Sequence, residues 1–186
     1  YYSVGKYVMN NKYPRTFHLP WSKGSTNDDK IAKDISYLIG NNIIISEKLD
    51  GGCSSIELNG CFARTHANAP THASFDHLKA FHSTIKHKLS PNVQLFGENL
   101  YAKHSIYYSE LPNYFMLFGV RELKTGIDHV WESWDMVKAW ANELEIPTVP
   151  VLYEGKVSSE KDLKKLVESL MIEPSCCGGI REGVVV

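Results

Sequence analysis

Three short apolar runs, each followed by a turn or a polar loop, constrain the fold of this chain most. The first is the β-branched run NNIIISEK at 41–48, which ends in a glycine turn. The others are VQLFGE at 93–98 and YFMLFGVRE at 114–122. Apolar runs of this length, rich in β-branched and aromatic residues, are typical of buried strands. We therefore expect a sheet that other elements cover.

Hairpin and helix signals surround these runs. Asn59-Gly60 in CSSIELNGCFART predicts a type I′ hairpin between two short strands. A last strand is expected from Ile180 onward. Apolar residues at helical spacing, with caps or stops at their ends, predict helices over 28–38, 74–89, 133–144 and 158–171. The pattern predicts one α+β domain with antiparallel hairpins.

Composition excludes several classes of protein. The chain has 186 residues, of which 43% are apolar, and its 20 Lys+Arg balance 21 Asp+Glu. Intrinsic disorder is excluded, and near-neutrality argues against a uniformly basic surface for nucleic acid. The four cysteines fit neither a zinc site nor a disulfide framework, and neither a membrane span nor a signal peptide is visible. We expect a soluble, cytoplasmic protein with reduced thiols.

The motif Glu47-Lys48-Leu49-Asp50-Gly51-Gly52 lies where the first apolar run meets its turn. A lysine at such a strand end becomes a nucleophile when burial or a nearby cation frees its lone pair. Glycines directly after it let the backbone approach a bulky ligand. On its own, the motif is equally consistent with a solvated lysine and a plain glycine turn.

Further motifs follow in a fixed order. Arg64 follows the predicted hairpin, Glu98 ends the second apolar run, Phe118 lies in the third, and Glu182 begins EGVV. The order KxDG, Arg, GE, aromatic strand, EGxV resembles the covalent nucleotidyltransferases, which are the polynucleotide ligases and mRNA capping enzymes. GENLYAKHSIYY and the arm PRTFHLPWSKG more narrowly resemble ATP-dependent RNA ligases of the phage RNA ligase 2 type. The resemblance covers about residues 12–186.

The resemblance implies an α+β fold and a reaction. The fold would be an ATP-grasp-like nucleotidyltransferase domain of antiparallel β-sheets flanked by helices, with the nucleotide between the sheets. Lys48 would attack the α-phosphate of ATP and hold AMP through a phosphoramide bond. AMP would then pass to the 5′-phosphate of nicked or broken RNA, and a 3′-hydroxyl would displace it. The expected enzyme is an RNA ligase of RNA repair.

The resemblance also implies roles for the other motif residues. Glu98 would accept hydrogen bonds from the ribose hydroxyls. Phe118 would stack on adenine. Arg64 would contact the transferred nucleotide or the incoming 5′-phosphate. Glu182 would orient Mg²⁺ or Mn²⁺ near the reactive phosphate. Structural alternatives are a surface acid for Glu98, a core residue for Phe118 and a surface ion pair for Arg64.

The main chain beside the nucleophile, from Glu47 to Leu49, is expected to read the adenine base. Asp50 is expected to form the turn that restrains Lys48 rather than to act as an acid or base. Members of the family have a further strand with a Lys-x-Lys pair after EGxV. Because this chain ends first, we expect 1–186 to be an adenylyltransferase domain truncated before its last Lys-containing strand.

Two kinds of alternative remain open. An ATP-dependent DNA ligase or an mRNA capping guanylyltransferase would share Lys48 and differ in base or acceptor. A non-catalytic module that binds a nucleotide or an RNA end would keep the pocket without turnover.

The segment 77–108 has four Lys and four His against one acid, interleaved with aromatics. That segment is consistent with a phosphate-tracking surface or with a solvated helix face.

Overall fold

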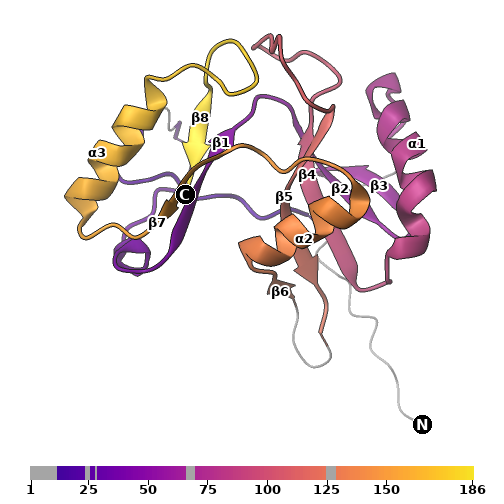
Figure 1. The fold of residues 1–186 in the computed structure, drawn as a ribbon, viewed down its shortest axis with the longest axis horizontal. Helices are drawn as coiled ribbons and strands as arrows, with labels where there is room; N and C mark the ends of the chain where they lie inside the picture. Colours follow the sequence, from indigo (N-terminus) through magenta and orange to yellow (C-terminus); the bar gives the residue numbers. More distant parts are fainter. Residues whose placement is uncertain (1–11, 24–25, 28, 66–69, 125–128) are drawn as a thin grey trace.

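The computed structural model describes residues 12–23, 26–27, 29–65, 70–124 and 129–186. Its strands form two antiparallel sheets that lie side by side (Figure 1). The three-stranded sheet has the order β7 (Val151–Gly155), β1 (Ile43–Lys48), β8 (Gly183–Val185). The five-stranded sheet has the order β3 (Gly60–Ala63), β2 (Gly52–Glu57), β4 (Val93–Asn99), β5 (Phe115–Glu122), β6 (Val130–Trp131). This arrangement confirms the predicted α+β class.

Helices cover both sheets. In Figure 1, α3 lies beside the three-stranded sheet, whereas α1 and α2 lie against the five-stranded sheet. None of the helices among the described residues is long and apolar enough to cross a membrane. The α-helices are α1 (Asp76–Ile85), α2 (Trp134–Leu144) and α3 (Glu160–Met171). Short 3₁₀ helices are η1 (Ser36–Leu38), η2 (Ala73–Phe75) and η3 (Lys86–Lys88).

Side-chain caps define where two of these helices begin. The Ser133 hydroxyl accepts from the Met136 N–H at the start of α2, and the Ser159 hydroxyl accepts from the Asp162 N–H at the start of α3. Each cap satisfies a backbone donor that has no partner within the helix. Both helices therefore begin where the sequence predicted, within one or two residues.

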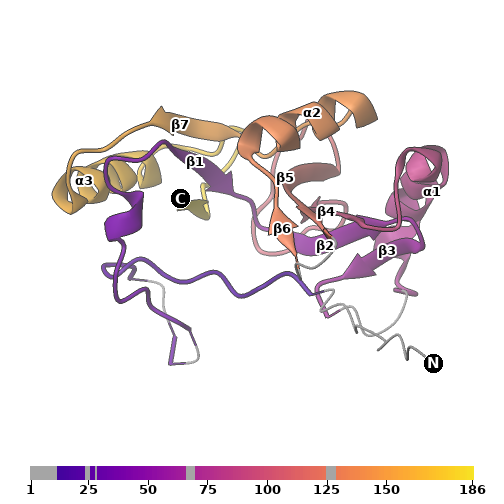
Figure 2. The ribbon, with the colours of Figure 1, turned by 90° about the horizontal axis from the view of Figure 1, so that it is seen from below.

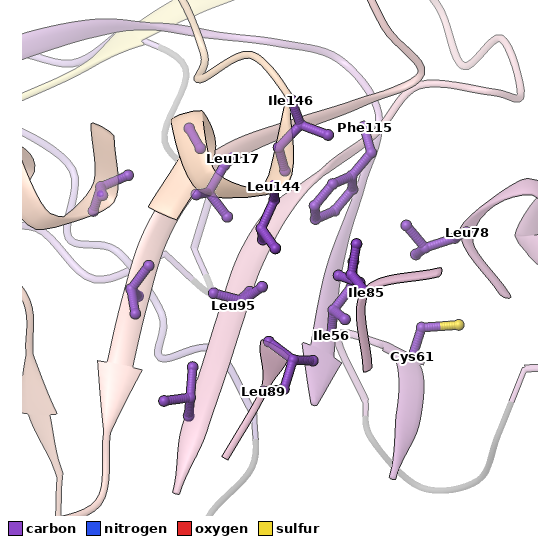
Figure 3. Close-up of a cluster of buried hydrophobic side chains, with 14 residues drawn as sticks. Ile56, Cys61, Leu78, Ile85, Leu89, Leu95, Phe115, Leu117, Leu144 and Ile146 are labelled. Carbon is purple, nitrogen blue, oxygen red and sulfur yellow. The ribbon is translucent and has the colours of Figure 1, made fainter. Parts of the chain in front are cut away.

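The largest core lies between the five-stranded sheet and helices α1 and α2 (Figure 3). Leu95 and Leu117 extend from the sheet toward Leu144 of α2, and Leu78 and Ile85 extend from α1. Leu95, Leu117 and Leu78 are fully buried. This core holds β4 and β5 in place, and these two strands supply the candidate nucleotide-binding side chains.

Two smaller cores complete the packing. Ile45 of β1 packs with Leu163 and Val167 of α3 under the three-stranded sheet. Leu49 packs with Met116 and other residues where the two sheets meet. The sheets are therefore joined by packing as well as by the chain itself.

The chain passes from one sheet to the other through a turn at 49–51. Figure 2 shows β1 leading directly into β2. A Cβ at Gly51 would lie 2.6 Å from the carbonyl oxygen of Asn99 and 2.9 Å from Leu100 Cδ2. Glycine is required because the turn presses against the end of β4. The close approach places the end of β1 beside the end of β4.

The helix predicted over 28–38 is wrong. Position 28 lies outside the described residues, Ile31 forms a β-bridge with His18, and only η1 is helical. Ile31 is exposed whereas Ile35 is buried, so these apolar positions do not share one buried face. The Asp34 carboxylate accepts from the Ser36 N–H, a local bond that competes with a longer helix.

The sequence did not predict strands β6 and β7. Strand β6 has two residues, too few for a period-two pattern. Strand β7 follows Pro150 directly and is an edge strand whose Val151 side chain is exposed. A proline beside a short edge strand hides the usual strand signal. Pairing with β1 is what defines β7 as a strand.

Candidate active site

Lys48 is the last residue of β1 and lies opposite Gly183 in the pairing with β8. Its side chain is half exposed, whereas Ile45 and Glu47 are buried on the other face of the strand, as alternation requires. The Lys48 Nζ donates to Glu182 Oε1 at a distance of 2.5 Å. The amine therefore lies on an open face, oriented by a carboxylate from the strand segment next to it.

Glu98 approaches the same place from the five-stranded sheet. It lies on β4 opposite Cys53 of β2, and its Oε1 accepts from the Gly51 N–H at 3.1 Å. Burial raises the pKa of Glu98 to about 7, although the Lys48 charge and the Gly51 hydrogen bond lower it. The charge of Lys48, at the end of a strand of one sheet, thus acts on Glu98, which belongs to the other sheet.

Phe118 lies on β5, half-buried, with another aromatic ring against it. The Tyr13 ring meets it edge-on at 5.1 Å between centroids. Tyr13 also contacts Phe96 at 5.2 Å and Trp131 at 5.5 Å. The N-terminal arm therefore covers part of this face of the sheet. Adenine stacking on Phe118 stays a prediction, and the sequence did not predict Tyr13 as its neighbour.

Tyr13 lies at the start of the N-terminal arm. It is the aromatic residue directly before the PRTFHLPWSKG segment on which the resemblance partly rested. Nothing in that segment has a period, so its packing on the sheet was not visible from the sequence alone.

Arg64 follows β3 directly and is exposed. Burial and the Glu98 charge raise the pKa of Cys53 to about 12, and Arg64 opposes that shift. Arg64 also opposes the burial that raises the pKa of Tyr13. The Arg64 charge thus acts on Cys53 and Tyr13, on the side of the sheet where it could meet a phosphate.

Glu47 and Leu49 point away from the open face. The Glu47 carboxylate is 1% exposed; its Oε2 accepts from the Cys176 N–H at 2.9 Å and lies 3.6 Å from Arg181 Nη2. Leu49 is buried in the core between the sheets. Neither side chain faces the Lys48 amine, so only main-chain atoms at these positions remain for a nucleotide.

Asp50 ties the Lys48 turn to the loop after β4. Its Oδ2 accepts from the Ser105 N–H, the Ser105 hydroxyl and the Ile106 N–H, all within 2.8 Å. Its own N–H donates to the Tyr108 hydroxyl oxygen. Burial opposes these bonds, but together they hold the pKa of Asp50 below its ordinary value. Asp50 is a structural acceptor, in line with the expected turn role.

The carboxylates at this site suit a divalent cation that keeps other ligands. Among the described residues, no group of three or more His, Cys, Asp or Glu side chains could hold a metal ion. Mg²⁺ commonly binds through one or two carboxylates together with waters and phosphate oxygens. Glu182, at the open face beside Lys48, fits that pattern.

Two antiparallel sheets joined at a turn that presents a lysine are the arrangement expected from the resemblance to nucleotidyltransferase domains. The RNA ligase family model matches residues 41–186. The chain belongs to the RNA ligase family, which confirms the resemblance seen in the sequence. No curated protein matches the chain.

Solved structures agree on the fold. A structure of Naegleria gruberi RNA ligase with PPi has a TM-score of 0.58 and 16% identity, covering 80% of this chain and 46% of that one. A lysine-to-alanine mutant of the same ligase with ATP and Mn has a TM-score of 0.56 and 15% identity, covering 80% and 47%. An archaeal ATP-dependent RNA ligase has a TM-score of 0.54 and 16% identity, covering 80% and 40%. The chain spans less than half the length of these proteins.

Proposed function

We propose that this chain supplies the nucleotidyltransferase centre of an ATP-dependent RNA ligase that acts through a covalent lysyl-AMP. The observation that carries the proposal is the convergence of Lys48, Glu182 and Glu98 where the two sheets meet. Membership of the RNA ligase family supports it. So does the likeness in fold to a ligase whose structure was solved with ATP and Mn.

The reaction has three steps. Lys48 Nζ attacks the α-phosphorus of ATP; a P–N bond forms, the bond to the bridging oxygen breaks, and pyrophosphate leaves. The amine must first lose a proton, and Glu182 Oε1, 2.5 Å away, is in place to accept it. An oxygen of an RNA 5′-phosphate then attacks the same phosphorus and breaks the P–N bond. Finally, an RNA 3′-hydroxyl attacks the activated 5′-phosphate, and AMP leaves.

Residues around Lys48 bind and orient the nucleotide. Glu98 accepts from the ribose hydroxyls, and Arg64 contacts a phosphate. Phe118 stacks on adenine, which requires the Tyr13 ring to shift or to form part of the base site. Main-chain atoms from Glu47 to Leu49 read the base edge. These assignments follow the family resemblance, and the effect of the Lys48 charge on Glu98 supports the one made for Glu98.

Glu182, together with the phosphate oxygens, would hold Mg²⁺ or Mn²⁺. A divalent ion there supplies neutralisation of phosphate charge and acts as a Lewis acid. Glu182 would thus have three roles, since it orients the Lys48 amine, accepts its proton and would hold the cation.

The proposal is tested by covalent labelling of the full-length protein with ATP that carries a label on its α-phosphate. Wild-type protein should become labelled, and excess pyrophosphate should remove the label. Lys48→Ala should abolish labelling, whereas Lys161→Ala, which removes an exposed lysine on α3, should not. Label retained in Lys48→Ala would show that the nucleophile is wrong.

Three further measurements separate the alternatives. Labelling from GTP in place of ATP would indicate a capping enzyme. A nicked duplex with an RNA 3′-hydroxyl strand should be sealed, and preference for a DNA 3′-hydroxyl strand would indicate a DNA ligase. Nucleotide binding without any covalent label would indicate a non-catalytic module.

A further inference from the structure

A hollow lies beside the Lys48 turn, on the loop that follows β4. It has a volume of about 600 Å³ and is lined by residues 100–103, 106–109 and 111–114 together with Asp50. Lys48, Glu98 and Glu182 are absent from the described residues that line it. Its volume is within the range of small-ligand sites, about 300–1,000 Å³. The hollow is therefore distinct from the proposed nucleotide site and adjacent to it.

Three exposed tyrosines line this hollow. The exposed fractions are 52% for Tyr101, 68% for Tyr107 and 50% for Tyr114. The fold uses a different tyrosine of the same loop, Tyr108, which is buried with the core between the sheets. Exposed aromatic rings that line one hollow add little to the stability of the fold. They suit a ligand that presents flat rings for stacking.

Neighbouring side chains hold two of these rings in place. Tyr101 and Tyr114 meet edge-on, with centroids 5.2 Å apart. His77 of α1 stacks on Tyr101 at 4.8 Å with an interplanar angle of 15°. A ring that is already fixed loses little freedom when a base stacks on it, which favours binding.

One side chain of the hollow, Lys103, offers a cation to a phosphate. Asp50 and Lys103 are the charged residues among the described lining. The Asp50 carboxylate is engaged by three hydrogen bonds from Ser105 and Ile106. Lys103 Nζ lies 6.0 Å from the Tyr107 ring centroid and is exposed. Proteins commonly bind single-stranded nucleic acid through aromatic rings that lie next to lysine or arginine side chains.

The same Asp50 bonds set the distance between the hollow and the nucleophile. Asp50 is two residues from Lys48 and binds the loop through its carboxylate and its N–H. A strand whose 5′-phosphate lies at Lys48 can thus place its next bases in a hollow of fixed position. We propose that this hollow stacks unpaired bases of the RNA strand whose end is held at Lys48, an inference that rests on the proposed function.

The first test measures the affinity of the full-length protein for a 5′-phosphorylated single-stranded RNA by fluorescence anisotropy, without ATP. Tyr101→Ala and Tyr107→Ala should each weaken binding about tenfold, the loss expected for one stacked base. Tyr107→Phe keeps the ring and should bind as the wild type does. The matched control is Tyr37→Ala, since Tyr37 is 66% exposed but lies on η1, and it should not change the affinity.

The second test distinguishes stacking from an indirect effect of the substitutions. RNA with a single abasic residue, scanned over the positions next to its 5′ end, should at the position that stacks on Tyr107 bind the wild type about tenfold more weakly than intact RNA. It should bind Tyr107→Ala with no further loss, because the base and the ring remove the same contact. Full additivity of the two losses would show that Tyr107 does not contact these bases, and the proposal would be overturned.

A third measurement keeps this inference apart from the proposed function. Labelling with ATP should be at the wild-type level in both tyrosine-to-alanine variants. An unlabelled wild type would overturn the proposed function. Normal labelling with unchanged RNA affinity in both variants would overturn the RNA-binding hollow alone. Loss of a protein partner in these variants, with RNA affinity unchanged, would also overturn it.

Discussion

The position of Glu98 suits ligand binding, but burying its charged carboxylate destabilises the folded state. Burial raises its pKa to about 7 from an ordinary 4.5, so the folded protein holds this proton more tightly than the unfolded chain does. Between pH 4.5 and about 7 the folded state therefore binds more protons, and stability falls as pH rises. A carboxylate kept in spite of such a cost is typical of a functional site.

Replacing Glu98 by Gln should separate these two effects. Because glutamine does not ionise, Glu98→Gln should be more stable than the wild type at pH 8 by up to about 3 kcal/mol, and nearly equal to it at pH 4. Labelling by ATP should fall at the same time, since the ribose loses its charged acceptor. Urea unfolding at both pH values measures the stability. A difference that is the same at both would contradict the shifted pKa.

A second ion pair lies behind Lys48 and Glu182. Glu47 and Arg181, their neighbours in sequence, form a buried pair on the opposite face, with side chains 0% and 2% exposed. Arg181 also donates to the Leu170 carbonyl at the end of α3. The two pairs together hold the end of β1 against the segment that leads into β8.

Arg181→Met should leave the Glu47 carboxylate buried without its partner. Removing one member of a buried ion pair costs about 3–5 kcal/mol, so the free energy of unfolding should fall by that amount. Adding Glu47→Gln should recover part of the loss, because the uncompensated charge disappears. Chemical denaturation of both variants measures this. A loss below about 1 kcal/mol in Arg181→Met would contradict the structural role.

At the scale of elements, the turn between β1 and β2 is the most constrained connection. Gly51→Ala would bring a Cβ to 2.6 Å from the Asn99 carbonyl oxygen. The turn or β4 must then shift, which we expect to cost about 1–3 kcal/mol. Gly52→Ala is the matched control, since its Cβ would be 4.0 Å from the nearest atoms. Thermal unfolding compares them, and equal losses would contradict the close approach at Gly51.

Local patterns predicted most of the elements. The strands at 43–48, 93–99 and 115–122 have apolar runs, and the helices at 134–144 and 160–171 have serine caps and periodic apolar faces. These signals are local because an apolar run, a periodic apolar face or a serine cap is each contained in one short stretch of the sequence. Strand β6 is defined by its pairing with β5, and β7 by its pairing with the distant β1, so their own residues show little pattern.

At the scale of the molecule, the proposed nucleotide site is shared between two sheets. Lys48 is in the three-stranded sheet, and Glu182 directly precedes strand β8 of that sheet. Glu98 and Phe118 are in the five-stranded sheet. A ligand that contacts both sets should stabilise both sheets together, because each must be in place to bind it.

ATP should therefore raise the stability of the whole domain. At 100 times its dissociation constant, a ligand that binds only the folded state adds about 2.7 kcal/mol. Hydrogen exchange of the full-length protein should slow in both β1 and β4 when ATP is added. Glu98→Gln should weaken this protection, and protection confined to one sheet would contradict a shared site.

The sequence by itself determined the fold class, the family and the candidate nucleophile, because strand, turn and motif signals are local and occur in a fixed order. Tertiary structure alone decided which side chains meet. It turned Glu47 and Leu49 into the interior, brought Glu182 to Lys48 across 134 residues, and laid Tyr13 against Phe118. Such contacts depend on sheet pairing and register, which no single stretch of the sequence specifies.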